Sequence, residues 1–351
     1  MRRVSRLALA SAATAAFAVT VSACGGTSSD AAKSEDGGKK KGVAIAYDVG
    51  GAGDQSFNDA ATAGMDKAAA DFKIGKKAVE PNDGESDADK IQRLTELAKQ
   101  GYNPVIGVGF AYAPAVKEVA AKHPDVTFGI VDDATINAKN VADLVFTEEQ
   151  SSYLAGVAAA KATKSKTVGF VGGVDNPLIR KFEAGFVQGV QATDKSVKVK
   201  RQFLTDKPED GGFSSPDKGK EAASGQIEGG ADVVYHAAGL SGQGVIEAAA
   251  AKKVWAIGVD SDQYKQKALD KYKKYILTSA TKDVSGAVYN LVKSVQDDKA
   301  EGGVVRADLK SGGVGLADSN PEFMKMKDLQ AALKKAEQGI GSGKIKVKTK
   351  L

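Results

Sequence analysis

Residues 44–59 read Ala44-Ile-Ala-Tyr-Asp-Val-Gly-Gly-Ala-Gly-Asp-Gln-Ser-Phe-Asn-Asp59, and they set the class of fold that the rest of the chain completes. The short apolar run from Val43 to Ala46 predicts a buried strand. A turn with three glycines follows, and then a helix for which Ser56 is the expected N-cap. The apolar face of this helix would begin with Gly64, Met65, Ala68 and Phe72. Strand, turn and helix form the first half of a βα unit.

The glycine turn carries side chains that are suited to binding. It offers two carboxylates, an amide and an aromatic ring, from Asp48, Asp54, Asn58 and Phe57. In open α/β sheets, ligands bind outside the carboxyl ends of the strands, where such turns lie. The alternative is an ordinary βα turn, in which Phe57 packs in the core and Asp54 and Asn58 are cap residues. These residue types favour ligand binding over catalysis.

Composition and charge indicate an α/β protein and argue against a nucleic-acid partner. The chain has 351 residues, 42% of them hydrophobic and 26% charged, which is typical of one large or two medium domains. The net charge of +5 includes three arginines in residues 1–23, which hold no acid, so 46 basic residues face 44 acids in the remainder and leave it at +2. No block of Lys and Arg is interleaved with aromatic residues. A near-neutral balance fits a small neutral ligand.

The single cysteine, Cys24, has a position that indicates lipidation. Arg2, Arg3 and Arg6 precede a short apolar stretch, and three small residues stand directly before Cys24-Gly25. This pattern predicts a lipoprotein signal peptide in residues 1–23 and an acylated Cys24. The alternative is an ordinary cleaved signal with an incidental cysteine. Residues 24–41 are poor in large apolar residues and predict a flexible tether.

Short apolar runs then alternate with helical patterns, which is typical of a parallel α/β sheet. In the first half we expect strands at Val43–Tyr47, Lys77–Glu80, Pro104–Val108, Val126–Val131 and Val141–Val145. The helices between them are expected at Phe57–Phe72, Asp87–Gln100 and Ala113–Lys122.

The pattern restarts with a small-residue helix from Thr147. Strands are then expected at Thr167–Val171, Val197–Phe203, Asp232–Ala237 and Val254–Val259, and helices at Leu178–Gln191, Pro216–Ile227 and Gly242–Lys252. Two similar halves in tandem suggest two domains of one architecture. Strands at Tyr275–Ala280, Val304–Leu309 and Gly313–Leu316 and helices at Asp283–Asp298 and Glu322–Gln338 are too few for a third core. They would complete the two existing sheets and form a hinge of several crossings.

The predicted domains follow from this pattern. An N-terminal lobe would comprise residues 42–147 and 277–311, and a C-terminal lobe residues 148–276 and 312–340. Residues 341–351 are rich in Lys and Gly and are expected to be a frayed tail or an edge strand.

Polar residues follow the predicted strands where each strand ends. They are Asp48, Asp132 with Asp133, Gly172-Gly173, the run from Gly239 to Gly244, and Asp260 with Asp262. Carboxylates on two opposing lobes suit a ligand rich in hydroxyl groups, because charge-assisted hydrogen bonds are strong. Lys282 follows another strand and could contact the same ligand while balancing Asp260. The alternatives are a solvated turn for Asp132 and Asp133, and a surface helix-start position for Lys282.

The run Asp-x-Gly-x-x-x-Asp-x-Ser-Phe-Asn from Asp48 to Asn58 resembles the opening signature of the basic membrane protein family. These are substrate-binding lipoproteins that serve ABC importers as purine-nucleoside receptors. Further blocks that resemble the family are Ser152-Tyr-Leu-Ala-Gly156, Val168-Gly-Phe-Val-Gly-Gly173, Phe182-Glu-Ala-Gly-Phe186, Ala231-Asp-Val-Val-Tyr-His-Ala-Ala-Gly239 and Ile257-Gly-Val-Asp-Ser-Asp-Gln263. Together they cover nearly the whole chain after the tether.

The resemblance implies a type I periplasmic-binding-protein fold with a nucleoside held between two doubly wound lobes. Phe57 would stack on the base, Asp48 and Asn58 would line the base side, and Asp132 would reach the base or the ribose. Asp260 and Lys282 would hold the ribose hydroxyls. The resemblance leaves the second stacking aromatic open among Tyr235, His236 and Phe213, and Gly239 is also expected in the site. Tyr235 on an apolar strand could equally be a core residue, and His236 a structural imidazole.

The sequence contains few of the residues and motifs that are typical of enzyme active sites. His123 and His236 are the two histidines, and no zinc-binding, Gly-x-Ser-x-Gly or Walker motif is present. A carboxylate pair acting on a glycosidic bond is conceivable if Asp48, Asp132 and Asp260 converge. We expect no enzyme activity, no cofactor and no metal.

We therefore expect a monomeric receptor, lipid-anchored on the extracytoplasmic face of the cell membrane, that delivers a purine nucleoside to an ABC permease and its ATPase. The alternatives are a receptor of the same fold for a sugar, an autoinducer or riboflavin, and a surface lipoprotein that signals or adheres without transport.

Overall fold

The computed structural model describes residues 41–82 and 84–351, and residues 40–351 form one compact unit. The predicted signal peptide, Cys24 and the predicted tether up to residue 40 lie outside the described residues. Within the described ranges, no helix is both long enough and apolar enough to span a membrane.

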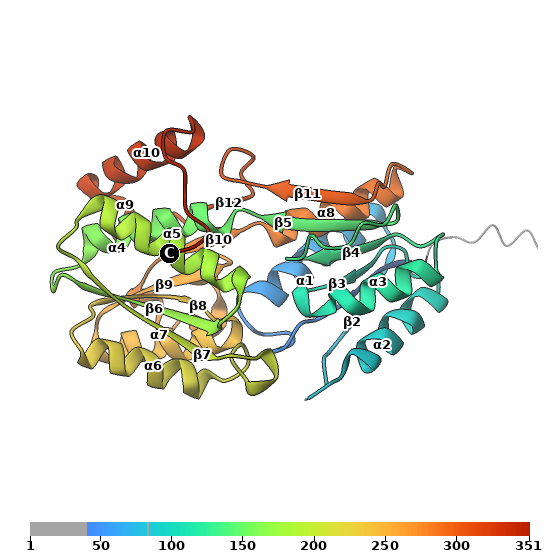
Figure 1. The fold of residues 1–351 in the computed structure, drawn as a ribbon, viewed down its shortest axis with the longest axis horizontal. Coiled ribbons are helices and arrows are strands. Elements are labelled where there is room, and N and C mark those ends of the chain that lie inside the picture. The colour runs from blue at the N-terminus through green and yellow to red at the C-terminus, as the bar shows by residue number, and fades with distance from the viewer. Residues whose placement is uncertain (1–40, 83) are drawn as a thin grey trace, which may run out of the picture. The chain divides into compact units, whose positions relative to one another are not determined.

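The first sheet contains six parallel strands in the order β11-β5-β4-β3-β1-β2 (Figure 1). Their bounds are Gly303–Ala307 for β11, Val141–Phe146 for β5, Phe128–Val131 for β4, Val105–Gly107 for β3, Gly42–Ala46 for β1 and Gly75–Val79 for β2. We call this sheet and its helices the first lobe.

Both faces of the first sheet are covered, and β1 shows how. Its side chains alternate, so Val43 and Ile45 pack with α1 and α8, whereas Ala44 and Ala46 pack on the face of α2 and α3. This explains the continuous apolar run, since a parallel strand buried on both faces has no polar side. The helices are α1 (Phe57–Phe72), α2 (Asp87–Lys99), α3 (Ala113–Lys122) and α8 (Val284–Gln296).

The second sheet repeats this plan in the order β12-β10-β9-β8-β6-β7, with β12 antiparallel to β10 and the other pairs parallel. The bounds are Val314–Leu316 for β12, Ile276–Lys282 for β10, Trp255–Asp260 for β9, Val233–Ala237 for β8, Thr167–Val174 for β6 and Lys198–Thr205 for β7. We call this sheet and its helices the second lobe.

The helices of the second lobe also form two layers. One face packs with α4 (Glu148–Ala162), α5 (Pro177–Thr193) and α10 (Lys327–Gly341), and the other with α6 (Pro216–Glu228) and α7 (Gly242–Lys252). A short helix, α9 (Pro321–Lys325), precedes α10. Short 3₁₀ turns lie at Phe110–Tyr112, Pro208–Asp210, Gly239–Ser241, Gln263–Lys265, Lys267–Leu269 and Lys273–Tyr275. The repeated order confirms the predicted α/β class with two similar halves.

Three segments of the described chain cross between the sheets: the junction of β5 and α4, the junction of β10 and α8, and residues 308–313 between β11 and β12. The crossings lie side by side, since Thr147 N donates to Ala307 O at 3.1 Å and Asp283 N donates to Gly313 O at 2.9 Å. Adjacent crossings are the arrangement of a hinge.

Two expectations from the sequence need correction here. β10 pairs with β9, so residues 277–282 belong to the second sheet and the return to the first lobe begins with α8, not at residue 277. The helix expected at Glu322–Gln338 is two helices, because Met326 between them has a non-helical backbone with ψ of 78°.

Candidate functional site

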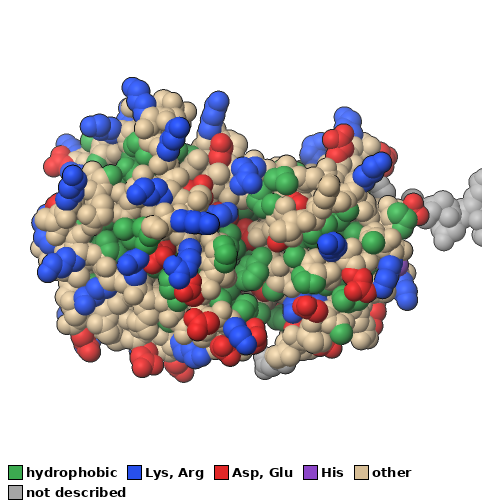
Figure 2. Space-filling view, viewed as in Figure 1, with side chains coloured by type: hydrophobic (Ala, Val, Ile, Leu, Met, Phe, Trp, Pro, Cys, Tyr) green, Lys and Arg blue, Asp and Glu red, His purple; other side chains and the backbone are tan. Residues whose placement is uncertain are grey.

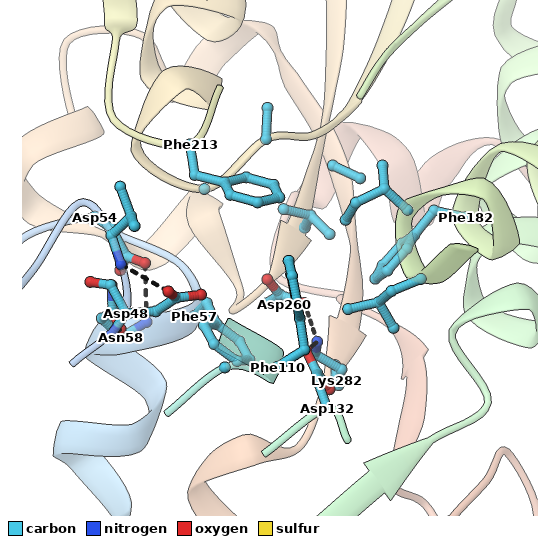
Figure 3. Close-up of a pocket in the computed structure, with 18 residues that line it drawn as sticks. Asp48, Asp54, Phe57, Asn58, Phe110, Asp132, Phe182, Phe213, Asp260 and Lys282 are labelled. Carbon is cyan, nitrogen blue, oxygen red and sulfur yellow. Dashed lines mark hydrogen bonds and ion pairs between the residues drawn. The ribbon is translucent and has the colours of Figure 1, made fainter. Parts of the chain in front are cut away.

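A cavity of about 50 Å³ lies between the carboxyl ends of the two sheets (Figure 3). This volume is smaller than that of most small-molecule sites. Both lobes line the cavity, the first with Asp48, Val49, Asp54, Phe57, Asn58, Gly109, Phe110 and Asp132, and the second with Leu178, Ile179, Phe182, Phe213, Ala237, Ala238, Gly239, Val259, Asp260 and Lys282. Most of the lining is apolar or aromatic, and a few polar groups converge in it.

The turn after β1 is held by Asp54, whose side chain accepts hydrogen bonds from backbone N–H groups at the start of α1. Its carboxylate accepts from Ser56 N at 2.9 Å, from Asn58 N at 2.8 Å and from Asp59 N at 3.1 Å. The predicted cap, Ser56, occupies the N-cap position, but its side chain makes no cap bond. Ser56 Oγ instead donates across the cavity edge to Val259 O at 3.1 Å. The predicted N-cap position of Ser56 is therefore confirmed, but the carboxylate of Asp54 takes the free N–H groups in place of the Ser56 side chain.

Asn58 and Asp48 are locked to each other at the end of β1. Asp48 N donates to Asn58 Oδ1 at 3.1 Å, and Val49 N donates to the Asp48 carboxylate at 2.8 Å. Burial raises the pKa of Asp48 to about 7, although the Val49 bond opposes the shift. Burial also raises the pKa of Asp54 to about 6, against its three backbone bonds.

Asp132 and Asp260 occupy equivalent places in the two lobes, directly after β4 and at the end of β9. Both have left-handed backbone, with φ of 68° and 62°. Such a conformation is uncommon outside glycine and tends to occur at functional sites. It turns each carboxylate toward the cavity, where Lys282 of β10 lies between them (Figure 3).

Lys282 is 3% exposed and holds this cluster together. Its Nζ lies 2.6 Å from Asp132 Oδ2 and 3.5 Å from Asp260 Oδ1. Burial lowers its pKa, but the carboxylates of Asp132, Asp260 and Glu148 outweigh burial and raise the pKa above the usual value. The lysine therefore stays charged although it is buried.

Glu148 is a further acid beside this cluster, at the start of α4 in the hinge. Its side chain is 1% exposed, and its Oε2 lies 3.5 Å from Lys181 Nζ. Burial, and then the charge of Asp132, raise the pKa of Glu148 to about 7, whereas Lys282 opposes the shift. Burial also raises the pKa of Asp260. Asp132 Oδ1 is buried and has no hydrogen-bond partner among the described residues.

Aromatic rings surround the charged cluster. Lys282 Nζ lies 4.5 Å from the centre of the Phe57 ring and 5.6 Å from that of Phe182. Phe213 enters from the loop between β7 and α6, facing the side from which Phe57 enters (Figure 3). Gly173 explains how that ring fits, because a Cβ there would lie 2.4 Å from the Phe213 ring.

The structure brings together most of the predicted site residues: Asp48, Phe57, Asn58, Asp132, Gly239, Asp260 and Lys282. Tyr235 is the exception and corrects the prediction. It is fully buried among Phe170 and Phe186, and its hydroxyl bonds to Ser152 Oγ at 3.0 Å. His236 is also buried, 3.0 Å from Gln263 Oε1, and burial lowers its pKa to about 4. Of the three aromatic candidates, Phe213 is the one in the cavity.

Phe110, Phe182 and Glu148 were missed by sequence reasoning. Phe110 could have been found, because Gly109-Phe110 follows β3 just as Gly239 follows β8 in the other lobe. Phe182 and Glu148 sit inside helices, where a pattern search assigns them to the core or to the surface. In residues 41–82 and 84–351, no group of His, Cys, Asp and Glu is arranged to hold a metal ion.

Hydrogen bonds between the lobes run along one edge of the cavity. Ser261 Oγ donates to Ser56 O at 2.7 Å, and Gln263 Nε2 donates to Gln55 O at 3.1 Å. Gln243 Nε2 donates to Gly53 O at 2.9 Å. The turn of the first lobe is thus attached to the strand ends of the second, which describes a closed arrangement of the lobes.

Comparison with known proteins places these observations in context. A sequence model described as "ABC transporter substrate-binding protein PnrA-like" matches residues 41–350. The "CD4+ T-cell-stimulating antigen" of Listeria innocua serovar 6a is 36% identical over 350 residues, which is 95% of this chain and 96% of that protein. The "ABC transporter nucleoside-binding protein BmpA" of Lactococcus lactis subsp. cremoris is 36% identical over 325 residues, 88% of this chain and 89% of that one.

Among solved structures, an ABC transporter solute-binding protein from Aeropyrum pernix K1 has a similar fold. It superposes with a TM-score of 0.76 at 29% identity, covering 88% of this chain and 93% of that one. The two-sheet α/β architecture is thus that of periplasmic-binding-protein-like solute receptors.

Proposed function

This chain belongs to the PnrA-like family of ABC transporter substrate-binding proteins, and we propose that within it the chain captures a purine nucleoside between its two lobes. The nucleoside is bound without covalent chemistry and is released to a membrane permease, whose ATPase partner supplies the energy. The observation that carries the proposal is a single cavity that combines aromatic rings with two carboxylates and a lysine. A purine base and a ribose need these two kinds of partner.

The base is proposed to lie between Phe57 and Phe213, one ring from each lobe. Every base has a π-face, and stacking on an aromatic side chain stabilises a bound base by about 1–3 kcal/mol. Asp48 and Asn58 would contact the polar edge of the base. The lock between these two residues fixes their positions before the ligand arrives, which reduces the entropy lost on binding.

The ribose is proposed to lie against Asp132, Asp260 and Lys282. Carboxylates accept hydrogen bonds from vicinal hydroxyl groups, and such charge-assisted bonds are the stronger kind. Asp132 Oδ1 is an unused acceptor in the cavity wall, where a ribose hydroxyl would supply the missing donor. Lys282 would donate to ribose oxygens while balancing the two acids.

The location is proposed from the sequence before the described residues. Cys24 would carry the lipid anchor, and residues 25–41 would tether the receptor to the extracytoplasmic face of the membrane. A monomer that closes on its ligand would dock on the permease in the closed state.

A thermal-shift screen of residues 40–351 tests the proposed ligand. Nucleosides, free bases, ribose, other sugars and riboflavin are compared at equal concentration. A ligand that binds only the native state stabilises it by about 2.7 kcal/mol at a hundredfold excess over Kd. We expect the largest shift in melting temperature from adenosine, guanosine or inosine, and unchanged nucleoside after incubation.

The variant Phe57→Ala should weaken nucleoside binding about ten- to a hundredfold, as expected for the loss of one stacking ring. Phe72→Ala is the matched control, because Phe72 lies at the other end of α1 and stacks on Tyr289 outside the cavity. The largest shift from a sugar or riboflavin, or equal binding by both variants, would contradict the nucleoside assignment while leaving the family intact.

A further inference from the structure

The segment that follows α10 carries a lysine at every second position: Lys344, Lys346, Lys348 and Lys350. We call these four residues the lysine ladder. The intervening Ile345 and Val347 are partly buried and pack against the hydrophobic cluster formed by α4, α5 and α10, whereas all four lysines are exposed. A period of two is that of extended chain with two different faces. One face of this segment is therefore attached to the second lobe, and the other presents only lysines.

The segment is held in place by its backbone as well as by its apolar face. The side chain of Gln188 on α5 donates to Lys346 O at 3.1 Å and accepts from Lys348 N at 2.7 Å. Ile345 N donates to Gly339 O at 2.9 Å. These bonds fix the segment across α5, where the end of the chain is marked in Figure 1. The sequence predicted a frayed tail or an edge strand, and the structure shows neither.

The ladder has no counter-charge of its own. None of its four side chains forms an ion pair or a hydrogen bond with any described residue, and residues 339–351 contain no acid. Neighbouring ladder lysines are two residues apart in the chain, so their like charges repel one another. Figure 2 shows further Lys and Arg side chains gathered on the face that carries α10 and α5. A fixed row of unbalanced positive charge calls for an anionic partner.

We propose that the lysine ladder binds the anionic surface of a phospholipid membrane. Lysine is a flexible point charge without the planar fork that selects a particular anion, and a row of such charges matches an extended array of phosphates. A juxtamembrane lysine contributes to attachment only within a screening length of the surface, about 10 Å at 0.1 M salt. This step rests on the lipid anchor of the proposed function, which would hold the protein at a membrane surface.

Binding to vesicles tests this proposal without the lipid anchor. Residues 40–351, which contain both sheets and all the core clusters, are sedimented with vesicles of mixed phosphatidylglycerol and phosphatidylcholine, and with phosphatidylcholine alone. We expect binding to the anionic vesicles only. It should fall at least tenfold between about 0.1 M and about 1 M salt, as the screening length shrinks from about 10 Å to about 3 Å.

The quadruple variant Lys344→Gln, Lys346→Gln, Lys348→Gln and Lys350→Gln should lose at least tenfold in vesicle affinity, and the corresponding four Lys→Arg changes should preserve it. The matched control replaces four exposed lysines of the same lobe near α7, on the opposite side of the second sheet: Lys253, Lys267, Lys271 and Lys274. This control has the same net charge as the ladder variant and should keep its binding.

Three results would overturn the proposal: equal binding by the parent and the ladder variant, equal loss in the ladder and control variants, or binding of soluble polyphosphate without binding of anionic vesicles. Nucleoside binding is measured on the same samples and should be unchanged in every variant. A loss of vesicle binding can thus be distinguished from a loss of nucleoside binding, so the two proposals are tested separately.

Discussion

At the scale of single residues, the site depends on buried charges that neutralise one another. Lys282 contacts Asp132 and Asp260 with its side chain buried, and Glu148 adds a third acid beside them. A buried charge is costly without a partner, so breaking such a cluster commonly destabilises a protein by about 3–5 kcal/mol. Burying these charges also costs desolvation energy, so the intact cluster adds little net stability, and its retention in the cavity points to a role in binding.

Asp48 gives the first prediction, which concerns pH. Its folded-state pKa is raised to about 7, so the folded protein holds a proton that the unfolded chain releases near pH 4. Its contribution to stability is complete below about pH 4 and is lost as pH rises to about 7. Asp48→Asn should remove this pH-dependent loss of unfolding free energy, which amounts to a few kcal/mol at most. The free energy of unfolding, measured by chemical denaturation across this range, should thus fall less steeply in the variant.

The control for this prediction is Asp66→Asn, a surface acid paired with Lys76 on the same lobe. It should leave the slope of stability against pH as it is in the parent. Asp54 and Glu148 have raised pKa values too, so a slope remains in every variant, and the difference between variants is the quantity to compare. Parallel curves for Asp48→Asn and the parent would show that Asp48 is ionised throughout.

At the scale of elements, two side chains near the start of α1 have different roles. Asp54 accepts three backbone N–H groups at the start of the helix, whereas Ser56 reaches the other lobe. A helix N-terminus is stabilised by an acceptor for its free N–H groups and by a nearby negative charge. Within one turn, Asp54 thus stabilises the start of the helix, whereas Ser56 connects the two lobes.

The second prediction separates these functions. Asp54→Ala should lower the free energy of unfolding by at least about 1–2 kcal/mol, the usual cost of losing a cap. Ser56→Ala should cost less stability, because no cap bond is lost, but should weaken ligand binding through the lost contact with Val259. Denaturation and calorimetric titration with the nucleoside identified in the screen measure the two effects. Equal stability loss in both variants would contradict this assignment.

At the scale of the whole molecule, two lobes of one plan meet at three crossings and close over one cavity. The bonds of Ser261, Gln263 and Gln243 to the first-lobe turn join the lobes along one edge of the cavity. A ligand that contacts both lobes favours closure, and contacts between the lobes favour it too. Ligand affinity and closure are therefore coupled.

The third prediction tests this coupling with the double variant Ser261→Ala and Gln243→Ala. Two bonds between the lobes are lost, each contributing about 0.5–1.5 kcal/mol, so nucleoside affinity should fall about five- to a hundredfold. The melting temperature without ligand should change little, since each lobe keeps its own core. Gln191→Ala is the control, because Gln191 bonds to Val197 O within the second lobe. Unchanged affinity in the double variant would show that these bonds do not favour the closed state.

The sequence by itself determined the order of strands and helices, the restart after residue 147 and the polar residues at the strand ends. These follow from local rules: apolar periodicity marks the elements, and parallel strands place their carboxyl ends at one edge. That is why the sequence alone predicts that Asp48, Asp132, Asp260 and Lys282 meet.

Only the tertiary structure decided which lobe receives β10, which aromatic residue faces Phe57, and where the lysine ladder lies. Each depends on contacts between residues far apart in the chain. Tyr235 and Phe213 are both aromatic residues of the second half, yet one is buried behind its strand and the other enters the cavity over Gly173. The physical reason is that a side chain's environment is set by packing between elements, which periodicity along the chain does not encode.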